Sequence, residues 1–223
     1  MALVTFDKHS HQLTVHSVFI IYGDAASDSV AQRIASDIDS HWNEPAAKIR
    51  MRNEWYAVHF NTNGRYQPDL KPETVWYNDD PSLYFFRVEE YVMGNISFVD
   101  GLNSNTGYFK LDNLLQTSTT AAHEFGHCIG LEHPNDLDIR GLGQPGIMYP
   151  RGTICDPEFQ YDPAAVPLQP GGTLMPHHRK VSQRDVDALR LSRISFNEMG
   201  KGNLGGFSSI YHEKHIAPPE EIK

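Results

Sequence analysis

The chain has 223 residues, of which 39% are hydrophobic and 21% charged, a balance typical of a globular protein with a substantial core. Its 28 acidic and 19 basic residues give a net charge of −9 without any basic block, so we expect no nucleic-acid partner. The longest strongly apolar run, residues 18–22, is far too short to span a bilayer, and residues 1–9 show no signal-peptide pattern. We therefore expect one domain, or two lobes around a cleft, without a membrane-spanning segment.

The first part of the chain predicts a strand, a helix and a second strand. Residues 12–23 and 55–60 are rich in β-branched and aromatic side chains, as strands are. Residues 27–43 predict a helix that stops before Pro45, because apolar side chains recur at every fourth position. This apolar stripe consists of Val30, Ile34, Ile38 and Trp42. The order of elements favours a parallel pair of strands with the helix packed across the sheet.

The middle of the chain predicts three further strands. Residues 65–83 are rich in Pro, Asn and Asp, which indicates a loop excursion. Strands are then predicted at 84–90, 95–100 and 106–112, and the last two are joined by a hairpin-like connection at 101–105. The residues most informative about function, 123–133, lie shortly after the last of these strands.

Five residues between positions 123 and 133 form a pattern typical of a catalytic metal site. On a helix, His123 and His127 lie on one face, so their imidazoles can bind the same ion. Glu124 projects close enough to contact a water on that ion without being a ligand. Gly130 can adopt a positive φ and turn the chain, which would bring His133 back as a third ligand. Three protein ligands leave the fourth position of a tetrahedral zinc open to water, as catalytic sites do.

This H-E-x-x-H-x-x-G-x-x-H stretch resembles the zinc-binding signature of the metzincin metallopeptidases. The resemblance covers residues 12–195 and is strong at 119–150. It implies an α+β fold, with a twisted mixed sheet of about five strands, two helices above the cleft, and a loop-rich lower lobe that has a C-terminal helix. On this interpretation, residues 1–130 form the N-terminal lobe and residues 131–223 the C-terminal lobe of one catalytic domain.

The resemblance also implies where substrate binds. In metzincins the second strand before the active-site helix is an antiparallel edge strand that pairs with extended substrate. Residues 95–101 take that place here, and the free backbone groups of an edge strand are what a peptide can pair with. Ile96 and Phe98 are therefore candidate substrate-binding residues.

A methionine in a tight turn beneath the zinc is a further metzincin feature, and the sequence offers two candidates for it. Residues 146–150, Gly-Ile-Met-Tyr-Pro, are similar to the matrixin form of this turn and make Met148 the preferred candidate. Met175, in Gly-Thr-Leu-Met-Pro, is the alternative. If Met148 is the turn residue, Tyr149 and Pro150 lead into the wall of the pocket that receives the side chain after the cleaved bond.

The C-terminal part predicts one helix and a loose tail. Ser182 and Asp185 form a capping-box-like start, and apolar residues follow that would form a buried face. These residues are Val186, Leu189 and Ile194. The helix is similar to the one that ends metzincin catalytic domains. Residues after Phe196 are rich in glycine and polar side chains, so we expect a loosely packed tail.

Other polar clusters are candidates for accessory ions. His9 and His11 alternate on one face of a predicted strand, an arrangement that could hold a metal, but we expect solvated histidines instead. Ca²⁺ is a common accessory ion in this superfamily, and two clusters could supply its oxygen ligands, although their spacing matches no regular calcium loop. These clusters are Asn78–Asp80 and the group Asp100, Asn103 and Asn105.

The two cysteines, Cys128 and Cys155, leave two alternatives open. A disulfide could tie the downstream loop to the helix if the two Cα atoms lie within about 7 Å of each other. Otherwise Cys128 is a small buried apolar residue. Cys155 and Glu132 are also the nominal fourth ligands if the metal has only a structural role.

Taken together, the site predicts an endopeptidase with one catalytic Zn²⁺ and Glu124 as general base. Two alternatives stay open. One is a zinc amidohydrolase that acts on a small amide or a cell-wall peptide, and the other is a non-catalytic binding module of the same fold. We expect a protein or peptide substrate and a monomer, and the resemblance alone favours extracellular over cytoplasmic action.

Overall fold

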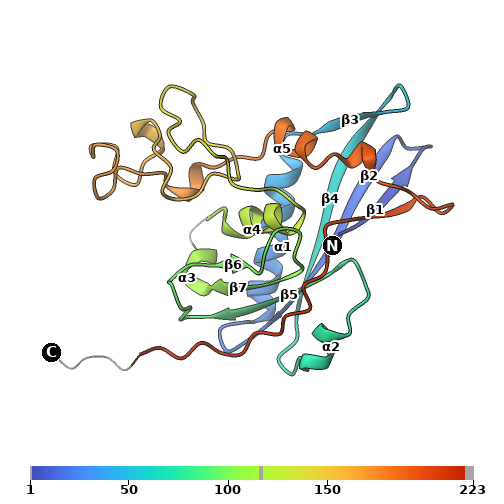
Figure 1. The fold of residues 1–223 in the computed structure, drawn as a ribbon, viewed down its shortest axis with the longest axis horizontal. Coiled ribbons are helices and arrows are strands. Elements are labelled where there is room, and N and C mark those ends of the chain that lie inside the picture. Colours follow the sequence, from blue (N-terminus) through green and yellow to red (C-terminus); the bar gives the residue numbers. More distant parts are fainter. Residues whose placement is uncertain (1, 116–117, 219–223) are drawn as a thin grey trace.

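The computed structural model describes residues 2–115 and 118–218, which form one mixed α+β structure around a strongly twisted sheet (Figure 1). The strands are β1 (Ala2–Asp7), β2 (Gln12–Tyr22), β3 (Lys48–Met51), β4 (Glu54–Tyr66), β5 (Leu83–Glu89), β6 (Phe98–Val99), β7 (Thr106–Lys110) and β8 (Lys201–Leu204). The α-helices are α1 (Asp28–Asn43), α2 (Pro72–Trp76), α3 (Leu111–Leu114), α4 (Thr120–Cys128) and α5 (Gln183–Ala188). The predicted α+β class is confirmed.

The sheet is mixed and larger than the sequence predicts. Its described residues form eight strands, with the order β3-β4-β2-β5-β7-β6 and with β1 between β2 and β8. The predicted parallel pair is confirmed as β2 and β4, and β5 and β7 extend the parallel part. The expectation of about five strands is wrong, because β1, β3 and β8 are three further strands. β1 and β3 form hairpins with β2 and β4, and β8 pairs with the distant β1.

The turn after β1 favours the expected solvated state of His9 and His11 over a metal pair. β1 pairs antiparallel with the first half of β2, and the turn between them contains His9 and His11. These two histidines are exposed and lie on no strand face, so the alternation that suggested a shared ion is absent. The second half of β2 pairs with β5 along the same edge that the first half uses for β1. Beyond β5 the sheet continues with β7 and β6.

Helix α1 crosses one face of the sheet and holds α4 in place. Ser27 caps α1 by accepting a hydrogen bond from the Val30 backbone N–H at 3.2 Å. α1 lies so close to β4 that a Cβ atom on Gly64 would stand 2.0 Å from the Ala31 carbonyl oxygen. At its other end, the indole of Trp42 donates a hydrogen bond to the Ala122 carbonyl of α4 at 3.0 Å. This contact positions the helix that carries the candidate site.

One continuous apolar core joins the sheet, α1 and α4. Phe125 of α4 lies at its centre, in edge-to-face contact with Trp42 of α1 and with Phe19 of β2. Cys128 belongs to the same core, whereas Cys155 packs with Ile139 and Leu174 in a separate small cluster. Both cysteines are buried free thiols, so the disulfide alternative is not realised.

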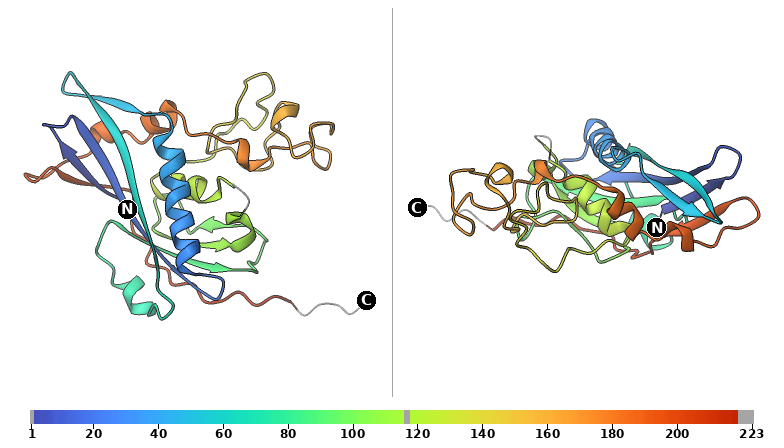
Figure 2. Two further views of the ribbon diagram at one scale, coloured as in Figure 1. Left: turned by 180° about the vertical axis from the view of Figure 1, so that it is seen from behind. Right: turned by 90° about the horizontal axis from the view of Figure 1, so that it is seen from above.

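The C-terminal tail is not loose. β8 pairs with β1, and the chain then runs along the face of the sheet opposite α1, as Figure 1 and the left view of Figure 2 show together. Its Ser208 backbone N–H donates to Asn105 at 3.0 Å, and the His212 imidazole lies 2.9 Å from both carboxylate oxygens of Asp100. The His215 backbone N–H donates to the Tyr108 hydroxyl at 3.1 Å. The expectation of a loosely packed tail is therefore wrong for residues 201–215.

The same contacts bear on the candidate calcium ligands. Asp100 and Asn105 direct their oxygens at the tail. Asp80 accepts hydrogen bonds from Ser82 within its own turn, at 2.8 Å from the backbone and 2.7 Å from the hydroxyl. The side-chain oxygens of Asp80, Asp100 and Asn105 are thus engaged by protein groups.

The segment from residue 129 to residue 182 is rich in loops, as predicted, and it lies beside the end of the sheet that carries β6 and β7 (Figure 1). The predicted C-terminal helix follows as α5, which is only six residues long. Its capping box is confirmed: Ser182 and Asp185 satisfy each other's backbone donors. None of the helices formed by the described residues has the length and apolar character that crossing a membrane requires.

Candidate metal centre

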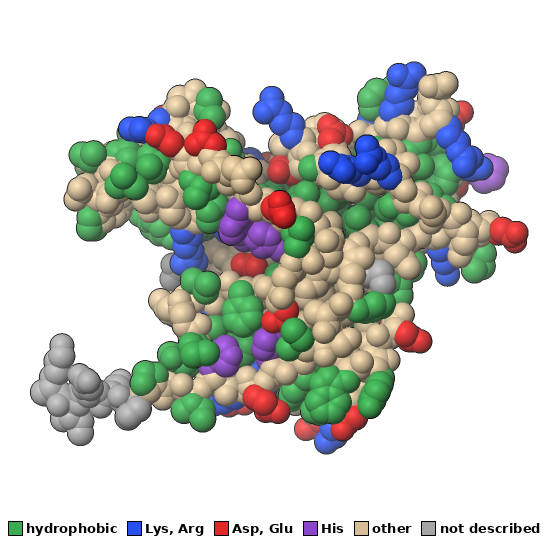
Figure 3. Space-filling view, viewed as in Figure 1, with side chains coloured by type: hydrophobic (Ala, Val, Ile, Leu, Met, Phe, Trp, Pro, Cys, Tyr) green, Lys and Arg blue, Asp and Glu red, His purple; other side chains and the backbone are tan. Residues whose placement is uncertain are grey.

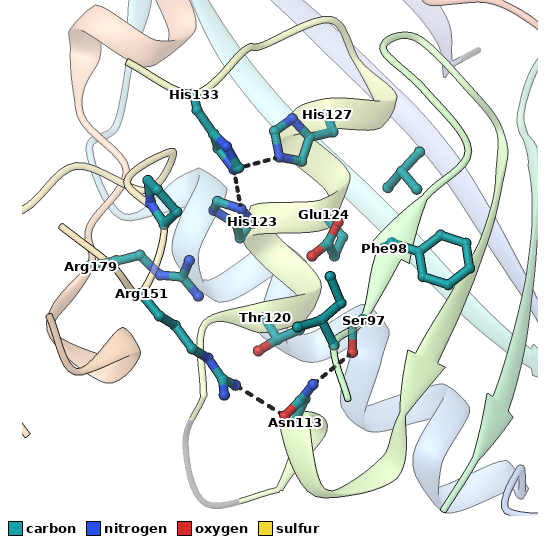
Figure 4. A pocket seen from close by; sticks show the side chains of 14 residues that line it. Ser97, Phe98, Asn113, Thr120, His123, Glu124, His127, His133, Arg151 and Arg179 are labelled. Atoms are coloured by element: carbon teal, nitrogen blue, oxygen red, sulfur yellow. Dashed lines mark hydrogen bonds between the residues drawn. The ribbon is translucent and has the colours of Figure 1, made fainter. Parts of the chain in front are cut away.

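Three histidine side chains converge on one point. His123 and His127 are one turn apart on α4, and Gly130, with φ of 103°, reverses the chain so that His133 returns over the helix. The Nε2 atom of His133 lies 3.1 Å from that of His123 and 3.0 Å from that of His127 (Figure 4). Nitrogens that bind one tetrahedral zinc at about 2.0–2.1 Å stand roughly 3.3 Å apart, so this arrangement fits such an ion.

Each helix histidine is oriented by a backbone carbonyl behind it. The Nδ1 atom of His123 lies 2.7 Å from the Ile147 carbonyl oxygen, and that of His127 lies 2.7 Å from the Leu131 carbonyl oxygen. Because a carbonyl can only accept, each Nδ1 carries the proton and donates it. The lone pair of each Nε2 is then directed at the shared point, which is the tautomer that a metal requires.

Burial keeps these imidazoles uncharged. It lowers the pKa of His123 well below the usual range and that of His127 to about 4, and it also lowers the pKa of His133. The positive charge of Arg179 acts in the same direction on all three. The histidines are therefore neutral at pH 7, and neutral imidazole is the form that binds metal ions.

Glu124 lies beside the histidines without belonging to their cluster. Among the described residues, the close group of candidate ligand atoms consists of the three histidines alone. The Glu124 carboxyl lines the same cavity, and its burial raises its pKa to about 8 against the opposing positive charges of Arg179 and Arg151. A carboxyl group whose pKa is close to neutrality is suited to exchange a proton with a reacting group.

The cavity in front of the histidines has a volume of about 440 Å³ and runs between β6 and the loop after residue 149. In Figure 3 it is the hollow beside the central group of histidine side chains, with basic side chains at its outer wall. Its lining consists of Ile96, Ser97, Phe98, Val99, Asn113, Thr120, His123, Glu124, His127, His133, Pro150, Arg151, Gly152 and Arg179.

Three of the four residues predicted to contact substrate lie at this cavity. Ile96 and Phe98 come from the β6 side and Pro150 from the opposite side. Tyr149 does not line it, because its side chain packs against the separate cluster of Ile139, Cys155 and Leu174. β6 is an antiparallel strand at the end of the sheet order, as the prediction for residues 95–101 requires, but only Phe98 and Val99 have strand geometry.

The structure distinguishes the two methionine candidates by position. Met148 is buried, and its sulfur lies so close to α4 that a Cβ atom on Gly126 would stand 2.3 Å from it. The residue before it, Ile147, supplies the carbonyl that orients His123. Met175 is half-buried and precedes a short 3₁₀ turn at residues 176–178. Met148 therefore packs against the helix that carries the two histidines.

Replacing Met148 by glutamine should destabilise the protein by about 1–3 kcal/mol, because the amide would be buried with few hydrogen-bond partners. The same change at Met175 should cost less, since that side chain is partly exposed. Chemical denaturation of the two variants, with bound zinc measured in parallel, compares them directly. Equal stabilities would show that Met148 does not support the site.

Sequence reasoning missed the basic side of the cavity. Arg151 directly follows Pro150, so its place could have been anticipated from the predicted wall. Arg179 carried no local signal, because it lies 46 residues after His133 in a loop without a recognisable motif. Asn113 and Thr120 precede the histidines and also reach the cavity, where Figure 4 shows them at the end away from His133.

The fold and site thus define an α+β protein with a three-histidine group that could hold a metal ion. No family model matches the chain, and no curated protein matches it either. Among solved structures it is similar to one described as "Structure of myroilysin", with 18% sequence identity and a TM-score of 0.28. That match covers 58% of this chain and 54% of the other, so the chain spans about half the length of that structure.

Proposed function

We propose that the protein is a zinc-dependent endopeptidase of the metzincin type. The observation that carries the proposal is the convergence of three neutral imidazoles on one point, with the Glu124 carboxyl in the same open cavity. His123, His127 and His133 would hold the zinc. The Nε2 atom of His133 lies 3.1 Å and 3.0 Å from those of His123 and His127, close to the separation expected for ligands of one zinc ion. When bound, zinc supplies an activated water and polarises the substrate carbonyl.

Glu124 is the general base in this proposal. Its carboxyl group would take a proton from the attacking water and pass it to the leaving amine, which requires hydrogen-bond reach to both. Its position beside the histidines, but outside the group of ligand atoms, suits that role. Met148 would support the site where it packs against Gly126 of α4.

The edge strand is the proposed binding surface for substrate. The described part of the sheet ends at β6, so the outer backbone groups of this strand are available to an extended peptide. Ile96 would contact a side chain of that peptide on one wall and Pro150 on the other, whereas Phe98, whose ring packs against Tyr108 and His212, would contribute its backbone. A peptide bound in this way would cross the cavity in front of the histidines, which favours cleavage inside a chain.

The alternatives fit less well. A structural metal site needs a fourth protein ligand, but Glu132 is exposed and Cys155 lies in a separate cluster. Within the described ranges, neither belongs to the group of ligand atoms. A non-catalytic binding module has no use for a buried carboxyl at the position of Glu124. An amidohydrolase for small amides would favour a closed pocket rather than one continuous with a sheet edge.

The test is a chelator-sensitive cleavage assay. Zinc-loaded protein should cut a denatured protein at internal bonds, should stop when 1,10-phenanthroline removes the metal, and should recover when zinc is returned. Hydrolysis of small amides without cleavage of proteins would instead identify an amidohydrolase. Zinc binding without any hydrolysis would identify the protein as a non-catalytic binding module.

A further inference from the structure

The wall of the cavity that faces β6 carries two arginines. Arg179 and Arg151 extend from the loop side, and Figure 4 shows the Arg179 guanidinium directed toward α4 and the Arg151 guanidinium directed toward Asn113 of α3. Glu124 is the only acidic residue among those that line the cavity. Positive charge therefore gathers here, although the chain as a whole has a net charge of −9.

Arg179 is a buried cation whose hydrogen bonds go to neutral oxygen atoms. It is only 3% exposed. Its Nε donates to the Thr119 hydroxyl at 2.7 Å and to the Pro176 carbonyl at 3.4 Å, and its Nη1 donates to the Tyr149 carbonyl at 3.2 Å. No carboxylate of the described residues forms an ion pair with it. Burial lowers the pKa of Arg179 to about 10, although the negative charge of Glu124 acts in the opposite direction, so the charge of the buried guanidinium is only partly compensated.

Arg151 is held at the same wall by a chain of hydrogen bonds. Its Nη2 donates to the Asn113 amide oxygen at 3.0 Å. The Asn113 amide group in turn donates to the Ser97 hydroxyl at 3.2 Å, beside β6. These bonds reach from one side of the cavity to the other and hold the Arg151 guanidinium at the cavity, while the rest of this side chain is exposed.

We propose that Arg179 and Arg151 bind a carboxylate group of the substrate next to the bond that is cleaved. Two guanidinium groups share the one Glu124 carboxyl of the cavity lining, so a substrate carboxylate would supply a second opposite charge, through the charge-assisted hydrogen bonds for which guanidinium groups are suited. The inference rests on the proposed peptidase function and specifies its substrate. Two sources share this chemistry: the side chain of an aspartate or glutamate beside the cleaved bond, and the free carboxyl group at the end of a peptide.

A set of matched peptides distinguishes the two sources. Each peptide contains a bond that the zinc-loaded protein cleaves, with Asp or Asn at each flanking position in turn, and with a free or amidated C-terminus close to that bond. We expect kcat/KM to rise at least ~10-fold with the carboxylate, because hydrogen bonds to charged groups are worth at least that factor. A preference for Asp over Asn identifies the side chain, and a preference for the free terminus identifies the chain end.

Variants of the exposed arginine connect the preference to this wall. Arg151→Gln should reduce the discrimination between Asp and Asn, or between free and amidated ends, mainly through KM. Arg151→Glu should shift the preference toward lysine at the same position, because the charge is reversed. Arg140→Gln is the matched control, since Arg140 is an exposed arginine that pairs with Asp138 and does not line the cavity. Arg179→Lys keeps the buried positive charge and so carries less risk to folding. It should also reduce the discrimination between carboxylate and neutral peptides, because lysine lacks the planar guanidinium group.

A binding measurement separates the failure of this inference from the failure of the proposed function. Fluorescence anisotropy with labelled peptides and the Glu124→Gln variant reads out carboxylate preference without turnover. If the wild-type protein cleaves no peptide but the variant still binds the carboxylate peptide preferentially, the peptidase proposal fails and the carboxylate site stands. If cleavage occurs and neither kcat/KM nor binding responds to the carboxylate, the site is refuted and the peptidase stands.

Discussion

Replacing Glu124 by alanine should remove most of the peptidase activity and leave the zinc in place. General acid–base catalysis contributes about 10²–10⁴-fold to a rate, so kcat/KM should fall by at least about 10²-fold. Zinc should be retained because the three histidines, and not Glu124, form the group of ligand atoms in the described structure. The measurements are kcat/KM on a cleaved peptide and the zinc content of the purified variant.

Glu132→Ala is the matched control for this prediction. Glu132 lies in the same sequence motif, adjacent to His133, but it is exposed and does not line the cavity. Its removal should leave turnover close to that of the wild-type protein. Glu124→Gln keeps the shape of the buried side chain and should fold normally, so it shows that loss of activity comes from the carboxyl group. Near-normal turnover in Glu124→Ala would mean that the proton is taken by another group.

The parts of the fold that the sequence predicted are those with a local pattern. β2, α1 and the start of β4 were found because apolar periodicity and β-branched residues mark them, whereas β4 continues beyond the predicted residue 60 to Tyr66. β1, β3 and β8 were missed, since short polar strands such as Lys201–Leu204 become strands only by pairing with a distant segment. The tail followed the same rule: Ser208 and His212 are ordered by Asn105 and Asp100, about a hundred residues earlier.

The candidate site likewise has residues that a local sequence pattern predicts and residues that it does not. His123, His127 and His133 could be predicted because a helix and one glycine turn bring them together within eleven residues of sequence. The atoms that complete the site come from farther along the chain. The Ile147 carbonyl orients His123, and Arg179 reaches the cavity through loops that carry no periodic signal. Tyr149 shows the limit of a resemblance: the resemblance made it a candidate for the pocket wall, but its side chain packs away from the cavity.

Removing one histidine from α4 should abolish retention of zinc. The purified wild-type protein should carry about one zinc per chain, and His127→Ala should lose it on dialysis, because two imidazoles cannot replace a three-ligand site. The neutral state of these imidazoles means that no proton has to be removed from them at pH 7, so binding should need no alkaline conditions. Atomic absorption of the dialysed protein gives the zinc content, and peptidase activity should fall with it.

His177→Ala is the matched control for zinc retention, since His177 is an exposed histidine outside the three-histidine group. It should keep its zinc and its activity. Circular dichroism of His127→Ala should show that the fold persists, because His127 lies at the cavity and not within the apolar core around Phe125. The decisive variant replaces His123, His127 and His133 together. If that protein still bound one zinc per chain after dialysis, the ion would lie elsewhere, and the assignment of the site would be wrong.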